Sequence, residues 1–135
     1  MNSREKPRIM LVENNTDAAS IMAGTLYLKG CNIYKTEDAK NCLKTLTELN
    51  GKVDVIVISQ ETVGNEDMNL IMGIKKINFD VKIIVVGNDD AIKNNIIDFG
   101  ADEFALKPLS PENMADKVLM LLAREASIAN ESTDG

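Results

Sequence analysis

The sequence contains no histidine and no tryptophan, and aromatic residues make up only 4% of its 135 positions. The absence of histidine removes the commonest metal ligand and the usual general base of enzymes. The only two cysteines, Cys31 and Cys42, are too far apart in the sequence to form a CxxC metal or redox motif. We therefore expect two free thiols, one near a loop and one on a helix.

The chain also lacks an excess of basic charge. Its 15 basic and 21 acidic side chains give a formal net charge of -6, and no basic run occurs. Nucleic-acid-binding domains usually carry a basic patch, so we expect no nucleic-acid partner. No apolar stretch reaches the length of a membrane span, and the N-terminal MNSREKP has no signal-peptide core. These absences predict a cytoplasmic protein without a membrane partner.

The sequence VDVIVIS at 53–59 is a short apolar run, with Val or Ile at five of seven positions. A short β-branched run of this kind predicts a strand that is buried on both faces, as in the middle of a parallel sheet. In open α/β sheets, functional sites lie just beyond the carboxyl ends of the strands. We therefore expect the functional site near Ser59.

The rest of the chain alternates between apolar runs and stretches with helical periodicity, separated by turn and cap residues. The expected strands are 8–12, 32–36, 53–59, 82–86 and 103–106. The expected helices are 18–29, 39–49, 66–77 and 92–99, and a last helix that begins at Ser110-Pro111 and fades near 124–126. In the first helix, Ala18, Ile21, Thr25 and Leu28 form the expected apolar stripe.

This alternation predicts an α/β fold with right-handed crossovers and a parallel sheet. The length allows one domain. We expect a flavodoxin-like, doubly wound, five-stranded parallel sheet in the order 2-1-3-4-5 with five helices. The domain should span residues 8–126, after an N-terminal extension at 1–7. The polar segment 127–135 is expected to be a disordered tail.

The first strand-to-helix turn, Glu13-Asn14-Asn15-Thr16, contains no glycine and presents an acid. A backbone cradle for phosphate needs exposed N–H groups and a close approach, which glycine usually provides. The turn therefore argues against a flavin or nucleotide site.

The segment GADEFALKPLSPE at 100–112 closely resembles the end of a response-regulator receiver domain, the input module of two-component (phosphorelay) signalling. In that family a strand delivers a lysine that precedes a proline, and a helix then begins. The aromatic residue, the lysine, the proline and the helix start all fall in register here. The resemblance extends over about 8–124.

The resemblance implies a role for each matching position. Receivers hold Mg²⁺ with an acidic pair after the first strand, which falls on Glu13 and Asn14. The phospho-accepting aspartate falls on Ser59. A backbone carbonyl that completes the metal shell would be that of Glu61.

The remaining matches concern the switch. The hydroxyl residue that follows the phosphoryl group falls on Gly87, and the aromatic switch residue falls on Phe104, for which we favour a packed role over a moving one. The lysine is retained as Lys107, and the resemblance implies a cis bond to Pro108.

Ser59 is a poor replacement for an aspartate acceptor. A hydroxyl is a weak nucleophile without an adjacent base, and only Glu13 is near in the expected fold. By default, the Ser59 hydroxyl should bond to neighbouring backbone groups. Mg²⁺ prefers carboxylate oxygens, and two of the family's three are missing, so no metal is expected. Glu13 and Glu61 remain weak metal candidates. We expect Lys107 to pair with Glu13, with Glu61 as the alternative.

The sequence thus predicts a receiver-like protein that is not phosphorylated at the usual position and acts through protein–protein interaction. The partner, a kinase, an output protein or a second copy, would bind the face formed by the fourth helix, fifth strand and fifth helix. One alternative is an atypical, phosphorylatable receiver that uses Mg²⁺. Another is a small-ligand-binding or enzymatic flavodoxin-like domain, although no nucleophile–base pair supports an enzyme.

Overall fold

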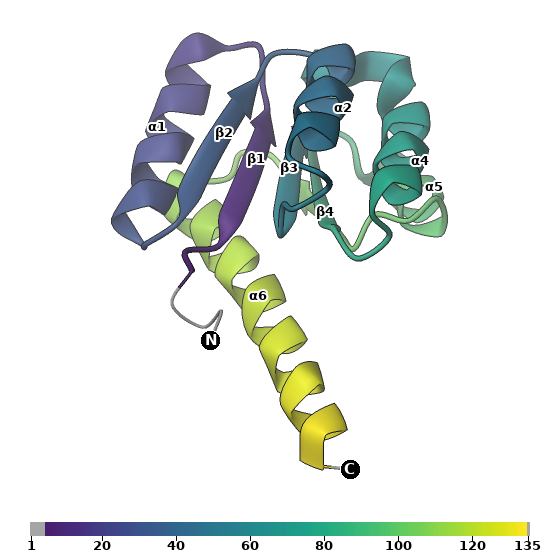
Figure 1. The fold of residues 1–135 in the computed structure, drawn as a ribbon. Coiled ribbons are helices and arrows are strands. Elements are labelled where there is room, and N and C mark those ends of the chain that lie inside the picture. Colours follow the sequence, from purple (N-terminus) through teal and green to yellow (C-terminus); the bar gives the residue numbers. More distant parts are fainter. Residues whose placement is uncertain (1–4, 135) are drawn as a thin grey trace.

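A computed structural model describes residues 5–134, with side chains described as far as residue 124. The chain forms one five-stranded parallel sheet between two layers of helices (Figure 1). The strands are β1 (Arg8–Val12), β2 (Asn32–Thr36), β3 (Val55–Ser59), β4 (Lys82–Gly87) and β5 (Glu103–Leu106). The helices are α1 (Thr16–Leu28), α2 (Ala39–Glu48), α3 (Gln60–Val63), α4 (Asp67–Ile77), α5 (Lys93–Asp98) and α6 (Pro111–Asp134), with 3-10 turns η2 (Gly64–Glu66) and η3 (Asp90–Ile92).

The strand order is β2-β1-β3-β4-β5, and every neighbouring pair is parallel. This confirms the flavodoxin-like fold expected from the sequence. All five residues of β3 are buried, as the β-branched run predicts. Each fully buried Ile or Val side chain contributes roughly 1.5–3 kcal/mol to folding. The central strand is therefore firmly held in the core.

Two apolar clusters fill the space on either side of the sheet. Alternate side chains of each strand point to opposite faces, so β3 contributes to both clusters. One cluster joins the sheet to α2, α4 and α5, and it includes Leu46, Ile56, Ile71 and Phe104. The other joins the sheet to α1 and α6. Ser59 continues the row of Val55 and Val57, which belong to the cluster under α1 and α6.

The residues that cap helices α1, α2 and α6 are polar side chains at the turns that the sequence indicates. The side chains of Asn15 and Asp38 accept hydrogen bonds from the first turns of α1 and α2. Ser110 Oγ accepts from the Asn113 N–H at the start of α6, and Pro111 is the first helical residue. Gly30, at φ 92°, occupies the left-handed conformation after α1 that favours glycine.

The buried side of α1 differs from the expected stripe of Ala18, Ile21, Thr25 and Leu28 by about one residue along the helix. The helix buries Ala19 and Leu26, whereas Leu28 is 85% exposed and Ile21 58% exposed. Helix α1 carries apolar residues around most of its surface, so two different stripes have helical spacing and the sequence alone does not distinguish them.

Two further expectations are corrected. The segment that follows β3, expected as a loop, begins with the short helix α3. Helix α6 continues to Asp134 and therefore includes most of the segment that was expected to be a disordered tail. Residues 112–134 contain no glycine or proline, so no residue stops the helix near residue 126. In Figure 1, α6 extends well past the edge of the sheet.

Both cysteines are buried and free. Burial, and secondarily the charge of Asp38, raises the pKa of the Cys42 thiol to about 12. Burial also raises the pKa of Cys31. A thiolate is the reactive form of cysteine, so these environments suit inert core residues.

None of the helices within residues 5–134 is both long enough and apolar enough to cross a membrane.

Candidate functional site

The carboxyl ends of four strands meet at one edge of the sheet. The register places Val12 opposite Ile58, and Ser59 opposite Val86. It also places Gly87 opposite Leu106. Parallel pairing therefore brings the strand-end positions Ser59 and Gly87 to the same end of the sheet as Glu13 and Lys107, which follow β1 and β5, as the sequence predicts.

The Lys107 ammonium pairs with Glu61, and not with Glu13 as expected. Lys107 Nζ lies 3.1 Å from Glu61 Oε1, and Asn88 Nδ2 donates to the same oxygen at 2.6 Å. The hydrogen bonds from Asn88 and Lys107, with the nearby positive charge, lower the pKa of Glu61. The bond between Lys107 and Pro108 is cis, as the resemblance implies.

Glu13 and Asn14 are engaged by Thr62. The Thr62 hydroxyl lies 3.1 Å from Glu13 Oε2 and 3.2 Å from Asn14 Oδ1, and it accepts the Asn14 N–H at 3.1 Å. A hydroxyl has one proton, so it donates to only one of the two side chains at a time. Glu13 Oε2 also accepts the Asn15 N–H at 3.1 Å.

Helix α3 supplies both of these connections from adjacent positions. Glu61 reaches toward the exits of β4 and β5, and Thr62 reaches toward the exit of β1. From the sequence, Glu61 is expected to act through its backbone carbonyl and is the alternative partner of Lys107, whereas the contacts of Thr62 and Asn88 are not predicted. Helical periodicity carried no signal for them, because α3 is only a single turn.

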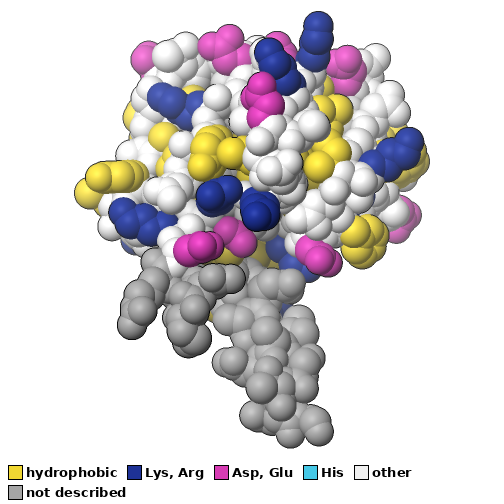
Figure 2. Space-filling model, in the orientation of Figure 1, with side chains coloured by type: hydrophobic (Ala, Val, Ile, Leu, Met, Phe, Trp, Pro, Cys, Tyr) yellow, Lys and Arg dark blue, Asp and Glu magenta, His cyan; other side chains and the backbone are white. Residues whose placement is uncertain are grey.

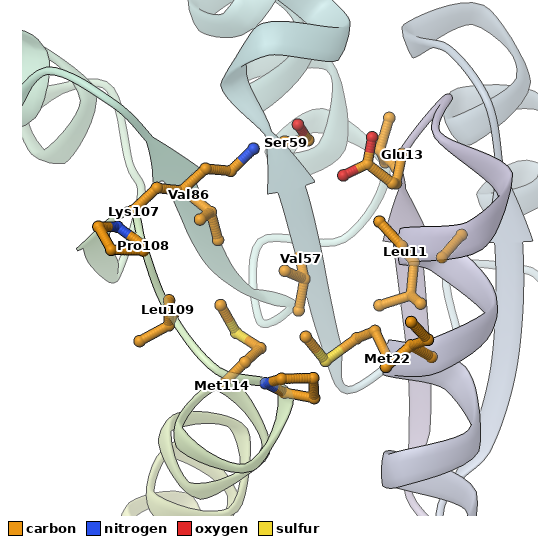
Figure 3. Close-up of a pocket in the computed structure, with 15 residues that line it drawn as sticks. Leu11, Glu13, Met22, Val57, Ser59, Val86, Lys107, Pro108, Leu109 and Met114 are labelled. Carbon is orange, nitrogen blue, oxygen red and sulfur yellow. The ribbon is translucent and has the colours of Figure 1, made fainter.

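Ser59 lies between Lys107 and Glu13 in the view of Figure 3. The residue is 5% exposed. Its hydroxyl oxygen has no hydrogen-bond partner among the described residues. The expectation that this hydroxyl bonds to neighbouring backbone groups is therefore wrong. An unpaired buried hydroxyl typically costs about 1–3 kcal/mol.

Gly87 and Phe104 are in contact on the opposite face of the sheet from Ser59. A Cβ atom added at Gly87 would lie 3.2 Å from Phe104 Cε1 and 3.3 Å from Phe104 Cζ. The Phe104 ring is buried and belongs to the cluster under α2, α4 and α5. The ring thus occupies space that a hydroxyl side chain at position 87 would need.

The donor groups do not suit Mg²⁺. This ion prefers several hard oxygen ligands, mostly carboxylates, in octahedral geometry. At the exits of β1 and β3 the family positions offer one carboxylate, that of Glu13, together with the amide of Asn14 and the hydroxyl of Ser59. Among residues with described side chains, no group of three or more Cys, Asp or Glu could hold a metal ion.

The parallel sheet of order 2-1-3-4-5, with a lysine and a cis-proline after its last strand, is the arrangement that the resemblance to receiver domains implies. The profile described as "Response regulator receiver domain" matches residues 9–119. The chain therefore belongs to the response-regulator receiver domain family.

Three relatives illustrate the likeness. The transcriptional regulatory protein PrrA of Mycobacterium tuberculosis is 22% identical over 130 residues, which are 95% of this chain and 55% of PrrA. This chain thus spans about half the length of that relative. A response regulator from Thermotoga maritima has a TM-score of 0.78 at 21% identity, covering 87% of this chain and 98% of that one. HP1043, an orphan response regulator of Helicobacter pylori, has a TM-score of 0.77 at 19% identity, covering 88% and 98%.

The Glu61–Lys107 pair should contribute to stability in a pH-dependent way. The pKa of Glu61 is lowered below 4.5 in the folded protein, so its stabilising effect is present above that pH and is lost as the pH falls through the folded-state value. We expect Glu61→Gln to be less stable than wild type at pH 7 and equal to it at strongly acidic pH. Urea unfolding from pH 7 to pH 3 measures this difference. The exposed Glu48→Gln on α2 is the control, and an equal pH response from both variants would contradict the assignment.

Gly87→Thr should destabilise the fold through Phe104. A side chain at this strand position reduces unfolded-state entropy by roughly 0.5–1 kcal/mol, but overpacking against the ring costs about 1–3 kcal/mol and should prevail. The cost should shrink in a Phe104→Leu background, because leucine lacks the Cε and Cζ atoms in contact. A double-mutant cycle by urea unfolding tests this coupling. Equal costs in the two backgrounds would show that the ring is not the obstacle.

Proposed function

We propose that this receiver-domain protein acts in the cytoplasm by binding another protein, without phosphorylation of Ser59. The observation that carries the proposal is the set of side chains at the site. Ser59 occupies the acceptor position, Asn14 replaces an acid and Gly87 removes the hydroxyl that would register a phosphoryl group.

The contacts around Lys107 support the same reading. In the family the lysine faces the phosphoryl group, and in this chain it faces Glu61 at 3.1 Å. The Glu61 carboxylate thus supplies a permanent negative charge from within the chain. Together with the buried Phe104 against Gly87, it favours a domain that remains in one signalling state.

The binding surface that we propose is formed by α5, β5 and α6. Exposed apolar side chains lie on each of these elements: Ile97 on α5, Leu106 on β5 and Met120 on α6. Such side chains favour association with another protein. The net charge of -6 argues against a nucleic-acid partner. In Figure 2, acidic and basic side chains are interspersed over the face that is drawn.

Incubation with Mg²⁺ and acetyl phosphate, followed by intact-mass measurement, tests the loss of phosphorylation. We expect no stable phosphoryl adduct on the wild type, because Ser59 lacks both a base and a metal site. The matched comparison is the variant Ser59→Asp combined with Asn14→Asp, which restores the acceptor and the acidic pair and should gain one phosphoryl group. A stable adduct on wild-type Ser59 or Glu61 would overturn the proposal.

Affinity capture from the source cells tests the binding surface. Leu106→Glu combined with Met120→Glu should abolish capture of the partner, because each change places a charge on an apolar contact. Leu28→Glu is the matched control on α1, since Leu28 is an exposed apolar residue outside the proposed surface. The partner is identified by mass spectrometry and its binding measured with purified protein. Loss of binding in Leu28→Glu alone would place the partner on α1 instead.

A further inference from the structure

A pocket of about 410 Å³ opens between α1 and the start of α6, on the face of the sheet that carries Ser59. Small-molecule sites typically have volumes of roughly 300–1,000 Å³. The wall is mostly apolar, and its side chains come from β1, α1, β3, β4 and the segment around α6. It includes Leu11, Met22, Val57, Val86, Leu109 and Met114 (Figure 3).

Polar groups are confined to one end of the pocket. Ser59, Glu13 and Lys107 line this end (Figure 3). The Ser59 side chain follows Val57 on the pocket face of β3, and its buried hydroxyl has no partner among the described residues. A polar atom that is buried without a partner is costly, and a ligand oxygen at this position would satisfy it.

The charges at this end favour an uncharged head group. Lys107 is already paired with Glu61, and the Glu13 carboxylate is held by Thr62 and the Asn15 N–H. Two carboxylates and one ammonium leave the end with a net negative charge. An anionic head group at Ser59 would lie near the Glu13 carboxylate and a cationic one near the Lys107 ammonium, so either would have a like charge beside it. A hydroxyl or carbonyl group adds no charge and can bond to Ser59.

We propose that this pocket binds an uncharged, mainly apolar small molecule that carries one hydroxyl or carbonyl group. The apolar body lies among Leu11, Met22, Val57 and Met114, and the oxygen bonds to Ser59 Oγ. Met22 and Met114 suit such a site because their flexible, polarisable side chains adapt to different ligand shapes. The site shares α6 with the proposed protein-binding surface, but the residues of that surface, Ile97, Leu106 and Met120, do not line the pocket.

Methyl-labelled methionine allows a direct test by NMR. Three probes share an eight-carbon chain and differ in head-group charge: 1-octanol, octanoate and octylammonium. We expect 1-octanol to shift the methyl signals of Met22 and Met114 in a saturable way. Met72 and Met120, which are exposed elsewhere, are internal controls and should not move. Octanoate and octylammonium should bind more weakly than 1-octanol.

Ser59→Ala separates the head-group contact from the apolar pocket. Loss of one hydrogen bond should weaken 1-octanol binding roughly three- to tenfold while the shifts remain at Met22 and Met114. The exposed Ser20→Ala on α1 should leave binding unchanged. The methyl spectrum without ligand verifies that both variants are folded.

Several outcomes would overturn the inference. Unmoved Met22 and Met114 signals with all three probes would show that the pocket does not bind such molecules. Equal shifts at Met72 and Met120 would indicate non-specific association with exposed apolar side chains. Tighter binding of octanoate or octylammonium would refute the uncharged head group, and unchanged affinity in Ser59→Ala would refute the contact with Ser59.

Discussion

Strand β3 is buried on both faces by two separate apolar clusters. This burial fixes the position of Ser59 at its carboxyl end and of helix α3, which follows. The chain must leave the sheet at Ser59, and helix α3 follows at once. Because α3 begins from so firmly held a strand, Glu61 and Thr62 are placed within reach of the neighbouring strand exits. The contacts on the two sides of Ser59 therefore depend on the packing of a strand that contributes few polar groups itself.

These contacts are made entirely within the chain. On one side of Ser59, an ammonium, a carboxylate and an amide meet in the group Lys107, Glu61 and Asn88. On the other side, Thr62 holds Glu13 and Asn14. Polar groups that would otherwise face an ion or a phosphoryl group are already satisfied by neighbours. The Ser59 hydroxyl, in contrast, has no partner among the described residues, and Ser59 lines the pocket between α1 and α6.

The sequence predicts the sheet well, because β3 and β4 are β-branched runs and capping side chains mark the starts of α1, α2 and α6. The strand ends, and with them the cluster of site positions, follow from parallel pairing. The choice between Glu13 and Glu61 as the partner of Lys107 could not be predicted, since it depends on the conformation of a single helical turn after β3. The buried side of α1 was misassigned because Leu28 and Leu26 are equally apolar. Which one is buried depends on how the helix lies against α6 and the sheet.

The two apolar clusters contain none of the polar site residues Glu13, Asn14, Glu61 or Lys107. Most of the folding free energy is thus carried by side chains that take no part in the chemistry of the strand exits. Substitutions of the exposed polar residues at the strand exits should therefore cost less folding free energy than substitutions in the two clusters. The residues at the carboxyl end of the sheet can therefore change, and with them the function of the site, while the two apolar clusters keep the same fold.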